Sequence, residues 1–544
     1  EPQFTFKTKL GYAEEKTQQV IPYTDDFEET YKKAYGERFL PGLPEIFWEL
    51  PEGQLSVKRY RYHDHVCQRF TESFADQVGG WCRNHHIKLT GHMMREPFLE
   101  GQTMALGEAM RAYRGFDIPG IDMLCDDREL TTAKQAQSAV HQYGYSGMTS
   151  EIYGVTNWDF DFRGHKLAGD WQAALGVTKR VHHLTWTTME GEAKRDYPAS
   201  IGYQSPWYRK YSYIENYFSR LNTVLSRGKA LVKVGVIHPI ESYWLYWGTR
   251  EHTDEICRQM EDNFANLVKW LLYGLIDFDF ISESLLADFN QKSESGFDAG
   301  EMNYDAVLVP SCVTLRQSTL KRLEDFAERG GKVIFAGNIP SHVDGVLDNR
   351  CRLLADRCVA VGFSRLEILE SLESERILEI RTETGSRAEN LLYQMREEGR
   401  RRWLFIAHCE KSPNPDLVQK ERLRISVKGV WEVIHLHPET GSWTEQTTWT
   451  ENGSTYWETD SYDQDSFLYC LIPSKERCEC KGKDTKTKEE KLVSALSVAQ
   501  VTLEEPNVLL LDLASYAFDD GDWQPEEEIL RIDNLFCKEL GLRL

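Results

Sequence analysis

The sequence predicts an α/β protein built on parallel sheets, with a (β/α)8-type barrel, followed by an antiparallel β-sandwich. Two observations predict this fold. From about 26 to 340, helical stretches alternate with short apolar strands, which is typical of parallel βα units. After about 400 the helical periodicity stops, and short strands follow one another with turn signals such as Glu451-Asn-Gly453 between them.

The helices are expected where apolar side chains recur at helical spacing. The stretch 62–85 shows this spacing clearly, because Val66, Phe70, Phe74 and Val78 fall on one face. The other expected helices span 26–35, 99–113, 131–143, 166–175, 207–227, 253–273, 315–329 and 525–540.

The first eight expected strands begin near 44, 87, 119, 145, 180, 231, 278 and 304, and a ninth spans 332–336. Eight parallel strands close a barrel. The strand 231–237 is apolar throughout, as in buried parallel sheets. The four strands from 231 to 336 therefore also suit a small doubly wound region of their own. Both partitions remain open at this point.

The domain organisation follows from these elements. We expect a linker at 1–25 and a (β/α) barrel catalytic domain at 26–230. A parallel α/β region at 231–400 either stands alone or completes the barrel, and a β-sandwich follows at 401–475. The last part, 476–544, is expected to contain a linker, a strand at 507–512 and a helix that lead to a module outside this chain.

Composition excludes several function classes. The 544 residues carry 64 Lys and Arg against 86 Asp and Glu, a formal charge of −22, which argues against a nucleic-acid partner. No apolar run approaches the about 20 residues of a membrane span. We therefore expect a soluble protein with no membrane partner. The sequence leaves the oligomeric state open, as well as the choice between a cytoplasmic and a secreted protein.

Side chains at the carboxyl ends of parallel strands carry the function in barrels and doubly wound sheets. Here these ends carry carboxylates interleaved with aromatic and imidazole groups. Glu151 ends the fourth strand and Glu283 the seventh, so these two are the expected catalytic carboxylates. The expected substrate-binding residues are His92, Glu96, Asp122, Tyr153, Trp158, Trp186 and Glu190.

This chemistry suits glycoside hydrolysis, in which two carboxyl groups flank the scissile bond and aromatic faces stack on sugar rings. Phosphate-binding glycine loops, the zinc motif His-Glu-x-x-His and the Gly-x-Ser-x-Gly nucleophile elbow are absent from the sequence. Asp122, Asp126 and Asp127 could hold Ca²⁺, the one cofactor considered, although a solvated loop fits equally. His63-Asp-His65 and His85-His86 lack a third ligand, so we interpret them as surface histidines.

The sequence resembles glycoside hydrolase family 106, the α-L-rhamnosidases. The resemblance is carried by Trp81-Cys-x4-Ile87-Lys-Leu-Thr-Gly-His92 with Glu96, by Pro119-Gly-Ile-Asp122, by Ser150-Glu-Ile-Tyr-Gly154 with Trp158, by Lys166 and Asp170-Trp171, by Phe39-Leu-Pro-x-Leu-Pro44 and by Trp403-Leu-Phe-Ile. More broadly, the chain looks like barrel hydrolases with a flavodoxin-like domain after the barrel, among them the family 42 β-galactosidases.

The resemblance implies a barrel, a flavodoxin-like region and β-sandwich modules. It also implies an inverting hydrolase with a possible Ca²⁺ at the sugar, in which Glu151 matches the general acid and Glu283 the base. The substrate would be a glycoside, most simply an α-L-rhamnoside. The alternatives are a retaining β-galactosidase-like enzyme, a non-catalytic carbohydrate-binding protein on a hydrolase scaffold, and a barrel lyase or isomerase.

Overall fold

The computed structural model describes residues 20–542 apart from 49, 191–196, 249, 292, 294, 415, 416, 418, 475–501 and 503–512. Its first sheet consists of four parallel strands in the order β1-β2-β3-β4. These are β1 (Thr90–Gly91), β2 (Ile118–Met123), β3 (Met148–Ile152) and β4 (Val177–His182). Three helices follow in the same βα repeat: α7 (Leu130–Tyr143), α8 (Phe162–Ala174) and α9 (Ser212–Leu225).

Local sequence sets the ends of these helices. The Asp161 side chain caps α8 by accepting the backbone N–H groups of Arg163 and Gly164. Helix α7 ends at Gly144, which has a left-handed φ of 67°, a conformation that costs glycine little. The helices expected at 131–143 and 166–175 are therefore confirmed.

Short helices precede and flank this sheet: α1 (Phe27–Tyr35), α2 (Pro44–Phe47), α3 (Val57–Phe70), α4 (Gln77–Asn84), α5 (Leu99–Ala105) and α6 (Ala109–Ala112), with a π-helical turn at Thr71–Asp76. The strand expected at 44–50 is wrong, because Pro44 starts α2 at the position where proline suits a helix. The single helix expected at 99–113 is divided near Gly107, which has a φ of 87°.

The histidines of α3 differ from expectation. His63 is fully buried and its ring lies against Trp244 and Trp247, and His65 is buried with Nε2 3.0 Å from the Thr30 hydroxyl. The surface interpretation is therefore wrong for this pair. It holds for His85 and His86, which are both exposed.

A second parallel sheet has the order β15-β12-β10-β6-β7. Its strands are β6 (Val234–Ile237), β7 (Phe278–Ile281), β10 (Ala306–Pro310), β12 (Lys332–Ala336) and β15 (Val359–Val361). Around it lie α10 (Ile240–Tyr246), α11 (Arg250–Tyr273), α12 (Glu283–Leu286), α13 (Gln317–Glu328), α14 (Arg350–Ala355) and α15 (Arg365–Ser371). The strands that begin near 231, 278 and 304 thus pair with one another and not with the first sheet.

The antiparallel region is a sandwich of two sheets. One has the order β16-β19-β23-β22 and the other β21-β20-β24-β18-β17-β5. The strands are β5 (Lys229–Ala230), β16 (Leu378–Thr382), β17 (Leu391–Glu398), β18 (Arg401–His408), β19 (Lys420–Lys428), β20 (Trp431–His437), β21 (Ser442–Glu445), β22 (Trp449–Glu451), β23 (Ser454–Tyr462) and β24 (Ser466–Pro473). Strand β5 comes from far earlier in the chain than its sheet partners.

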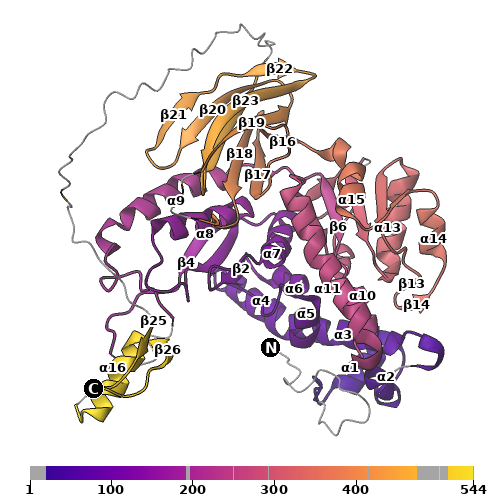
Figure 1. The fold of residues 1–544 in the computed structure, drawn as a ribbon. Helices are drawn as coiled ribbons and strands as arrows, with labels where there is room; N and C mark the ends of the chain where they lie inside the picture. Colours follow the sequence, from indigo (N-terminus) through magenta and orange to yellow (C-terminus); the bar gives the residue numbers. More distant parts are fainter. Residues whose placement is uncertain are drawn as a thin grey trace.

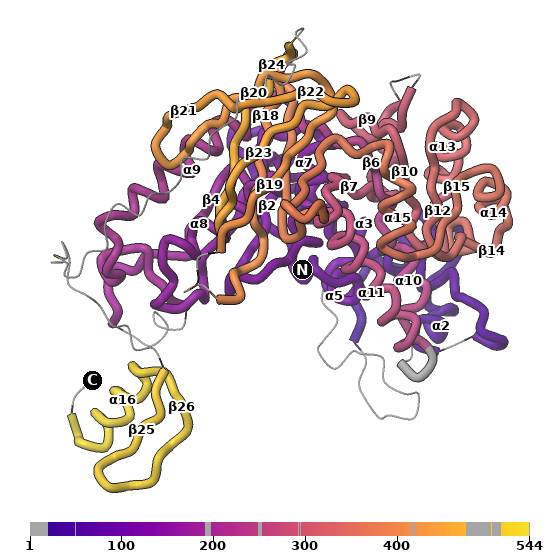
Figure 2. The backbone as a smooth tube through the Cα atoms, turned by 45° about the horizontal axis from the view of Figure 1, so that its top comes forward, coloured from indigo at the N-terminus to yellow at the C-terminus, as the bar shows by residue number. Residues whose placement is uncertain are grey.

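Figures 1 and 2 show the sandwich, in orange, beside the first sheet, with the second parallel sheet and α13 to α15 on the other side of the molecule. Residues from both parallel regions share one large core. The expected fold class, α/β with parallel sheets followed by an antiparallel sandwich, is confirmed.

Smaller elements complete the described chain: β8 (Phe297–Ala299), β9 (Met302–Tyr304), β11 (Thr314–Leu315), β13 (His342–Val343), β14 (Val346–Leu347), β25 (Leu513–Tyr516), β26 (Gln524–Glu528) and α16 (Ile529–Glu539). The strand expected at 507–512 lies outside the described residues. Within the described part, no helix combines the length and apolar character that crossing a bilayer requires.

Candidate active site

Four polar side chains meet at the carboxyl edge of the first sheet. Asp122 of β2 is the register partner of Glu151 of β3, so their side chains stand side by side. His92 directly follows β1 and His183 directly follows β4. We call His92, Asp122, Glu151 and His183 the Glu151 cluster.

Two imidazole rings approach the Glu151 carboxylate. His92 Nε2 is 3.9 Å from Glu151 Oε2 and 3.9 Å from Asp122 Oδ2. His183 Nε2 is 3.8 Å from Glu151 Oε1. Sequence reasoning missed His183, because the expected strand that begins near 180 continues to 187. The strand ends at His182, which brings the next residue to the sheet edge.

Asp122 is electrostatically unusual. Burial raises the pKa of its carboxyl group, and the nearby Glu151 carboxylate raises it further. Asp122 Oδ1 is buried and has no hydrogen-bond partner among the described residues. The Asp122 carboxyl group therefore keeps its proton to a higher pH than a solvated aspartate does.

The loops beyond this edge contain strained backbone. Cys125 and Asp126, after β2, have φ values of 58° and 53°, and Tyr153, Val155 and Asn157, after β3, have values of 77°, 57° and 70°. Left-handed backbone costs a non-glycine residue free energy and persists where the surroundings enforce it, commonly at functional sites. Five such residues in the loops at this edge of the sheet therefore indicate a functional site there.

A cavity of about 640 Å³ opens beside the cluster. Its acidic lining includes Glu96, Asp122, Asp127 and Glu129, with His92 at the same wall. Burial raises the pKa of Glu129 as well. Three expected substrate-binding residues, His92, Glu96 and Asp122, thus line one cavity.

The remaining four expected binding residues lie in three different settings. Trp158 and Trp186 form a ring pair with centroids 5.8 Å apart, in the loops that follow β3 and β4. Tyr153 is buried beneath the edge, where its hydroxyl donates to the His165 carbonyl and accepts from Arg180. Tyr153 therefore supports the loop and does not line the cavity. Glu190 is exposed, and its backbone N–H donates to the Thr188 hydroxyl.

The structure does not bring Glu283 to Glu151. Glu283 lies at the carboxyl end of β7 in the second sheet, where its Oε2 accepts the Arg316 backbone N–H at 2.7 Å. Among the charged groups around it, Glu241 has the largest effect on its pKa. Both carboxylates stand at strand ends, as the sequence indicates, but the strands belong to different sheets.

Burial raises the pKa of Glu283 to about 8, and the Glu241 charge adds to this rise. A carboxyl group whose pKa is higher in the folded state stabilises the fold at low pH, and this stability is lost as the pH rises through the folded pKa. We expect the melting temperature to fall between about pH 5 and pH 8, and Glu283→Gln to flatten that fall. Thermal unfolding of both proteins across this range checks it; parallel curves would contradict it.

His92, Asp122 and Glu151 also form a candidate cation site. Each offers one ligand atom, and these atoms lie within 4.8 Å of one another. Two carboxylates suit a hard cation such as Ca²⁺, whereas an imidazole ligand suits Mn²⁺ or Zn²⁺ better. Asp126 is not part of this set, because Arg128 and Lys411 pair with its carboxylate at 2.8 and 2.9 Å. The expected aspartate trio is therefore divided.

Comparison with known proteins finds one curated relative and several solved structures with a similar fold. No family model matches the chain. A curated protein of Formosa agariphila named "Putative beta-glucuronidase" is 23% identical over 340 residues, which cover 60% of this chain and 24% of that protein.

Two solved structures share the fold. The rhamnosidase from Novosphingobium sp. PP1Y superposes with a TM-score of 0.66 at 14% identity, covering 93% of this chain and 46% of that one. The β-galactosidase from Bacillus circulans sp. alkalophilus superposes with a TM-score of 0.57 at 12% identity, covering 83% and 77%. The chain thus has the fold found in these glycosidases, and it spans less than half the length of the rhamnosidase and of the curated relative.

Proposed function

We propose that this chain carries the catalytic groups of a glycoside hydrolase, with α-L-rhamnosides as the first substrate class to test. The observation that carries the proposal is the Glu151 cluster beside an acidic cavity of about 640 Å³, at the carboxyl edge of a parallel sheet. The fold shared with a rhamnosidase and β-galactosidases supports it.

In this proposal Glu151 protonates the leaving oxygen. His92 and His183 flank its carboxyl group, and the neighbouring Asp122 carboxyl group interacts with it electrostatically. The second catalytic carboxylate is proposed among those that line the neighbouring cavity, with Glu96 first, since Glu283 belongs to the other sheet. The lining of this cavity includes Asp122 but not Glu151. A separation of about 6.5–9.5 Å from the acid would suit an inverting reaction, and about 5–5.5 Å a retaining one. The Trp158–Trp186 pair would stack on the sugar.

The test is hydrolysis of a panel of nitrophenyl glycosides, with α-L-rhamnoside, β-D-galactoside and β-D-glucuronide included. We expect release of nitrophenol from the rhamnoside. The first-formed anomer, followed by NMR, distinguishes inversion from retention. Turnover of the galactoside alone, with retention, would favour the β-galactosidase-like alternative. Sugar binding without any turnover would favour the non-catalytic alternative and contradict the proposal.

The expected Ca²⁺ remains a prediction. If His92, Asp122 and Glu151 hold a cation, it would contribute positive charge that binds sugar hydroxyl groups. A ligating Glu151 carboxylate carries no proton, so a bound cation and the general-acid role of Glu151 are alternatives. We expect millimolar CaCl₂ to raise the melting temperature, since a ligand at about 100 times its Kd stabilises a fold by about 2.7 kcal/mol.

The matched variants for this measurement are Asp122→Asn and Asp127→Asn, since both residues line the cavity but only Asp122 belongs to the cation set. The shift should disappear in the first and persist in the second. MnCl₂ and ZnCl₂ serve as comparison ions, because of the imidazole ligand. Equal shifts in wild type and Asp122→Asn would reject this site.

A further inference from the structure

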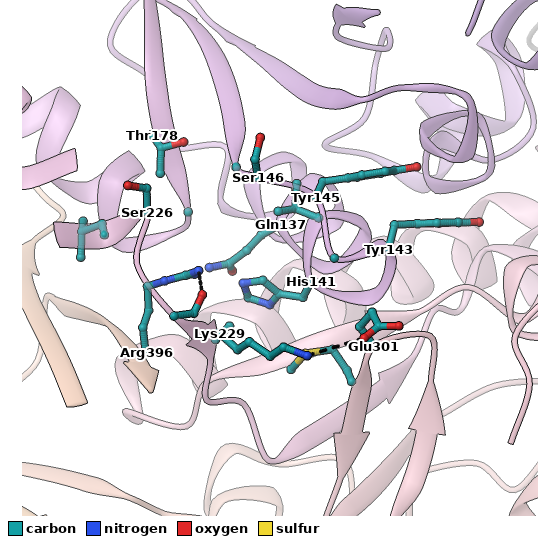
Figure 3. A pocket seen from close by; sticks show the side chains of 18 residues that line it. Gln137, His141, Tyr143, Tyr145, Ser146, Thr178, Ser226, Lys229, Glu301 and Arg396 are labelled. Carbon is teal, nitrogen blue, oxygen red and sulfur yellow. Dashed lines mark hydrogen bonds and ion pairs between the residues drawn. The ribbon is translucent and has the colours of Figure 1, made fainter. Parts of the chain in front are cut away.

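A second cavity lies at the opposite edge of the first sheet. It has a volume of about 450 Å³, and the loops that enter β3 and β4, at Ser146 and Gly176, form part of its wall (Figure 3). Helices α7 and α9, strands β5 and β17, and Glu301 and Met302 at the start of β9 supply most of the rest. The Glu151 cluster stands at the carboxyl ends of the same strands, so this cavity is separate from the candidate active site.

Arg396 of β17 brings a positive charge to this cavity. Its Nε donates to the Arg227 carbonyl at 2.7 Å, its Nη2 to the Gly228 carbonyl at 2.8 Å, and its Nη1 to Gln394 Oε1 at 3.4 Å. All three acceptors are neutral, and in the described part of the chain no carboxylate pairs with this guanidinium. Burial lowers its pKa to about 10. A half-buried cation without a counter-ion is costly, and an anion would relieve that cost.

Gln137 of α7 adds a second donor. The side chain is 1% exposed, and its Oε1 accepts from Lys134 Nζ at 2.5 Å, which turns the amide nitrogen towards the cavity. This Nε2 has no hydrogen-bond acceptor among the described residues. A buried donor left unpaired costs about 1–3 kcal/mol.

The two donors face each other. Figure 3 shows the Gln137 amide and the Arg396 guanidinium extending towards one another from opposite walls. Two donors cannot bond each other, so each suits an acceptor bound in this cavity. The Thr178 hydroxyl, also buried and without a partner among the described residues, lines the same cavity.

We propose that this cavity binds the carboxylate or sulfate group of a small polyhydroxylated ligand, such as an acidic sugar. The oxyanion would accept from Arg396 and from Gln137 Nε2, and guanidinium–oxyanion hydrogen bonds are among the stronger ones in proteins. The volume exceeds the needs of a bare ion, and the hydroxyl groups of Ser146, Thr178 and Ser226 suit a hydroxylated body.

The charges at the rim agree with this assignment. Lys229 Nζ is 3.6 Å from Glu301 Oε2, so these two opposite charges at the rim of the cavity balance each other. His141 Nδ1 lies 2.8 Å from Asp279 Oδ1, so this imidazole already has a carboxylate partner. Arg396 therefore remains as the uncompensated charge of the lining. Since Arg396 belongs to the sandwich and Gln137 to the first parallel region, a ligand held by both would fasten these two parts together.

The test is thermal unfolding at matched ionic strength with millimolar sodium sulfate, sodium glucuronate, glucose or sodium chloride. We expect a saturable rise in melting temperature with glucuronate, sulfate or both, and none with glucose or chloride. A response to both oxyanions assigns the site to the charged group alone, whereas a response to glucuronate alone assigns it to an acidic sugar. The absence of any saturable oxyanion response would overturn the proposal.

Variants tie the response to this cavity. Gln137→Glu supplies an internal carboxylate to Arg396, so it should raise the melting temperature without ligand and weaken oxyanion binding at least tenfold. Arg396→Lys should weaken binding as well, whereas Arg401→Lys, at the exposed start of the neighbouring strand β18, should not. Glu151→Gln should bind oxyanion normally, which separates this site from the candidate active site. Unchanged binding in Gln137→Glu would overturn the proposal even if Arg396→Lys fails to fold.

Discussion

Replacing Glu151 by glutamine is expected to lower kcat by about 10²–10⁴-fold, the usual contribution of a positioned general acid. The amide keeps the shape of the side chain but has no proton to give to a leaving oxygen. Because Glu151 is partly exposed and its contacts to His92 and His183 are near 4 Å, the substitution should leave the fold intact. A loss of turnover would then report on chemistry.

Leaving-group dependence distinguishes an acid from a nucleophile. A dinitrophenyl glycoside departs without protonation, so Glu151→Gln should spare its hydrolysis while nearly abolishing that of a methylumbelliferyl glycoside. Equal losses on both substrates would instead make Glu151 a nucleophile or base. Glu445→Gln is the control, since Glu445 is exposed on β21 in the sandwich. A control as inactive as Glu151→Gln would remove the special role given to Glu151.

Replacing Arg316 by methionine is expected to destabilise the fold by about 3–5 kcal/mol, the usual cost of removing one partner from a buried ion pair. Arg316 Nη2 is 2.6 Å from Asp64 Oδ1, and its Nε is 2.6 Å from Glu241 Oε1. Glu241 is 2% exposed. Without the guanidinium, Glu241 would keep the Tyr60 hydroxyl but no cation at this distance.

The same network holds the two parallel regions together. Asp64 of α3 also accepts from Arg111 of α6, and Arg111 pairs with Glu108 at 3.1 Å. Ser282 and Ser284, at the end of β7, donate to Glu108. Urea unfolding measures the loss. Arg352→Met is the control, since Arg352 pairs with Asp356 on the exposed face of α14 and should change stability by less than about 0.5 kcal/mol. Equal effects of the two substitutions would contradict the prediction.

Much of the fold is readable from the sequence, because periodicity reports burial. The strand expected at 332–336 matches β12 residue for residue, and the helix expected at 131–143 differs from α7 by one residue. The strand expected at 44–50 fails, since its apolar residues do not reveal that Pro44 begins a helix. Sheet membership was also left open: the spacing of strands along the chain does not say that those near 231, 278 and 304 pair together.

The candidate site was readable in part. Glu151, His92 and Asp122 follow or end strands of one sheet, so the sheet-edge rule brings them together. The same rule selected Glu283, since a carboxylate at a strand end looks alike in sequence whether it faces a cavity or a structural partner. Its partner Arg316 is recognisable only in three dimensions. His183 escaped because a shift of the strand end by a few residues changes which side chain reaches the edge.

Strand β5 has a consequence for how the protein is made. Ala230 pairs with Arg396, and Lys229 with Glu397, so the sandwich takes its edge strand from a segment synthesised long before the rest. At about 5–20 residues per second, β5 waits roughly 10 to 30 seconds for its partner on the ribosome. A sandwich expressed alone from position 378 would present β17 as a bare edge, which is a template for aggregation. Any fragment of this protein that includes the sandwich should therefore begin before position 229.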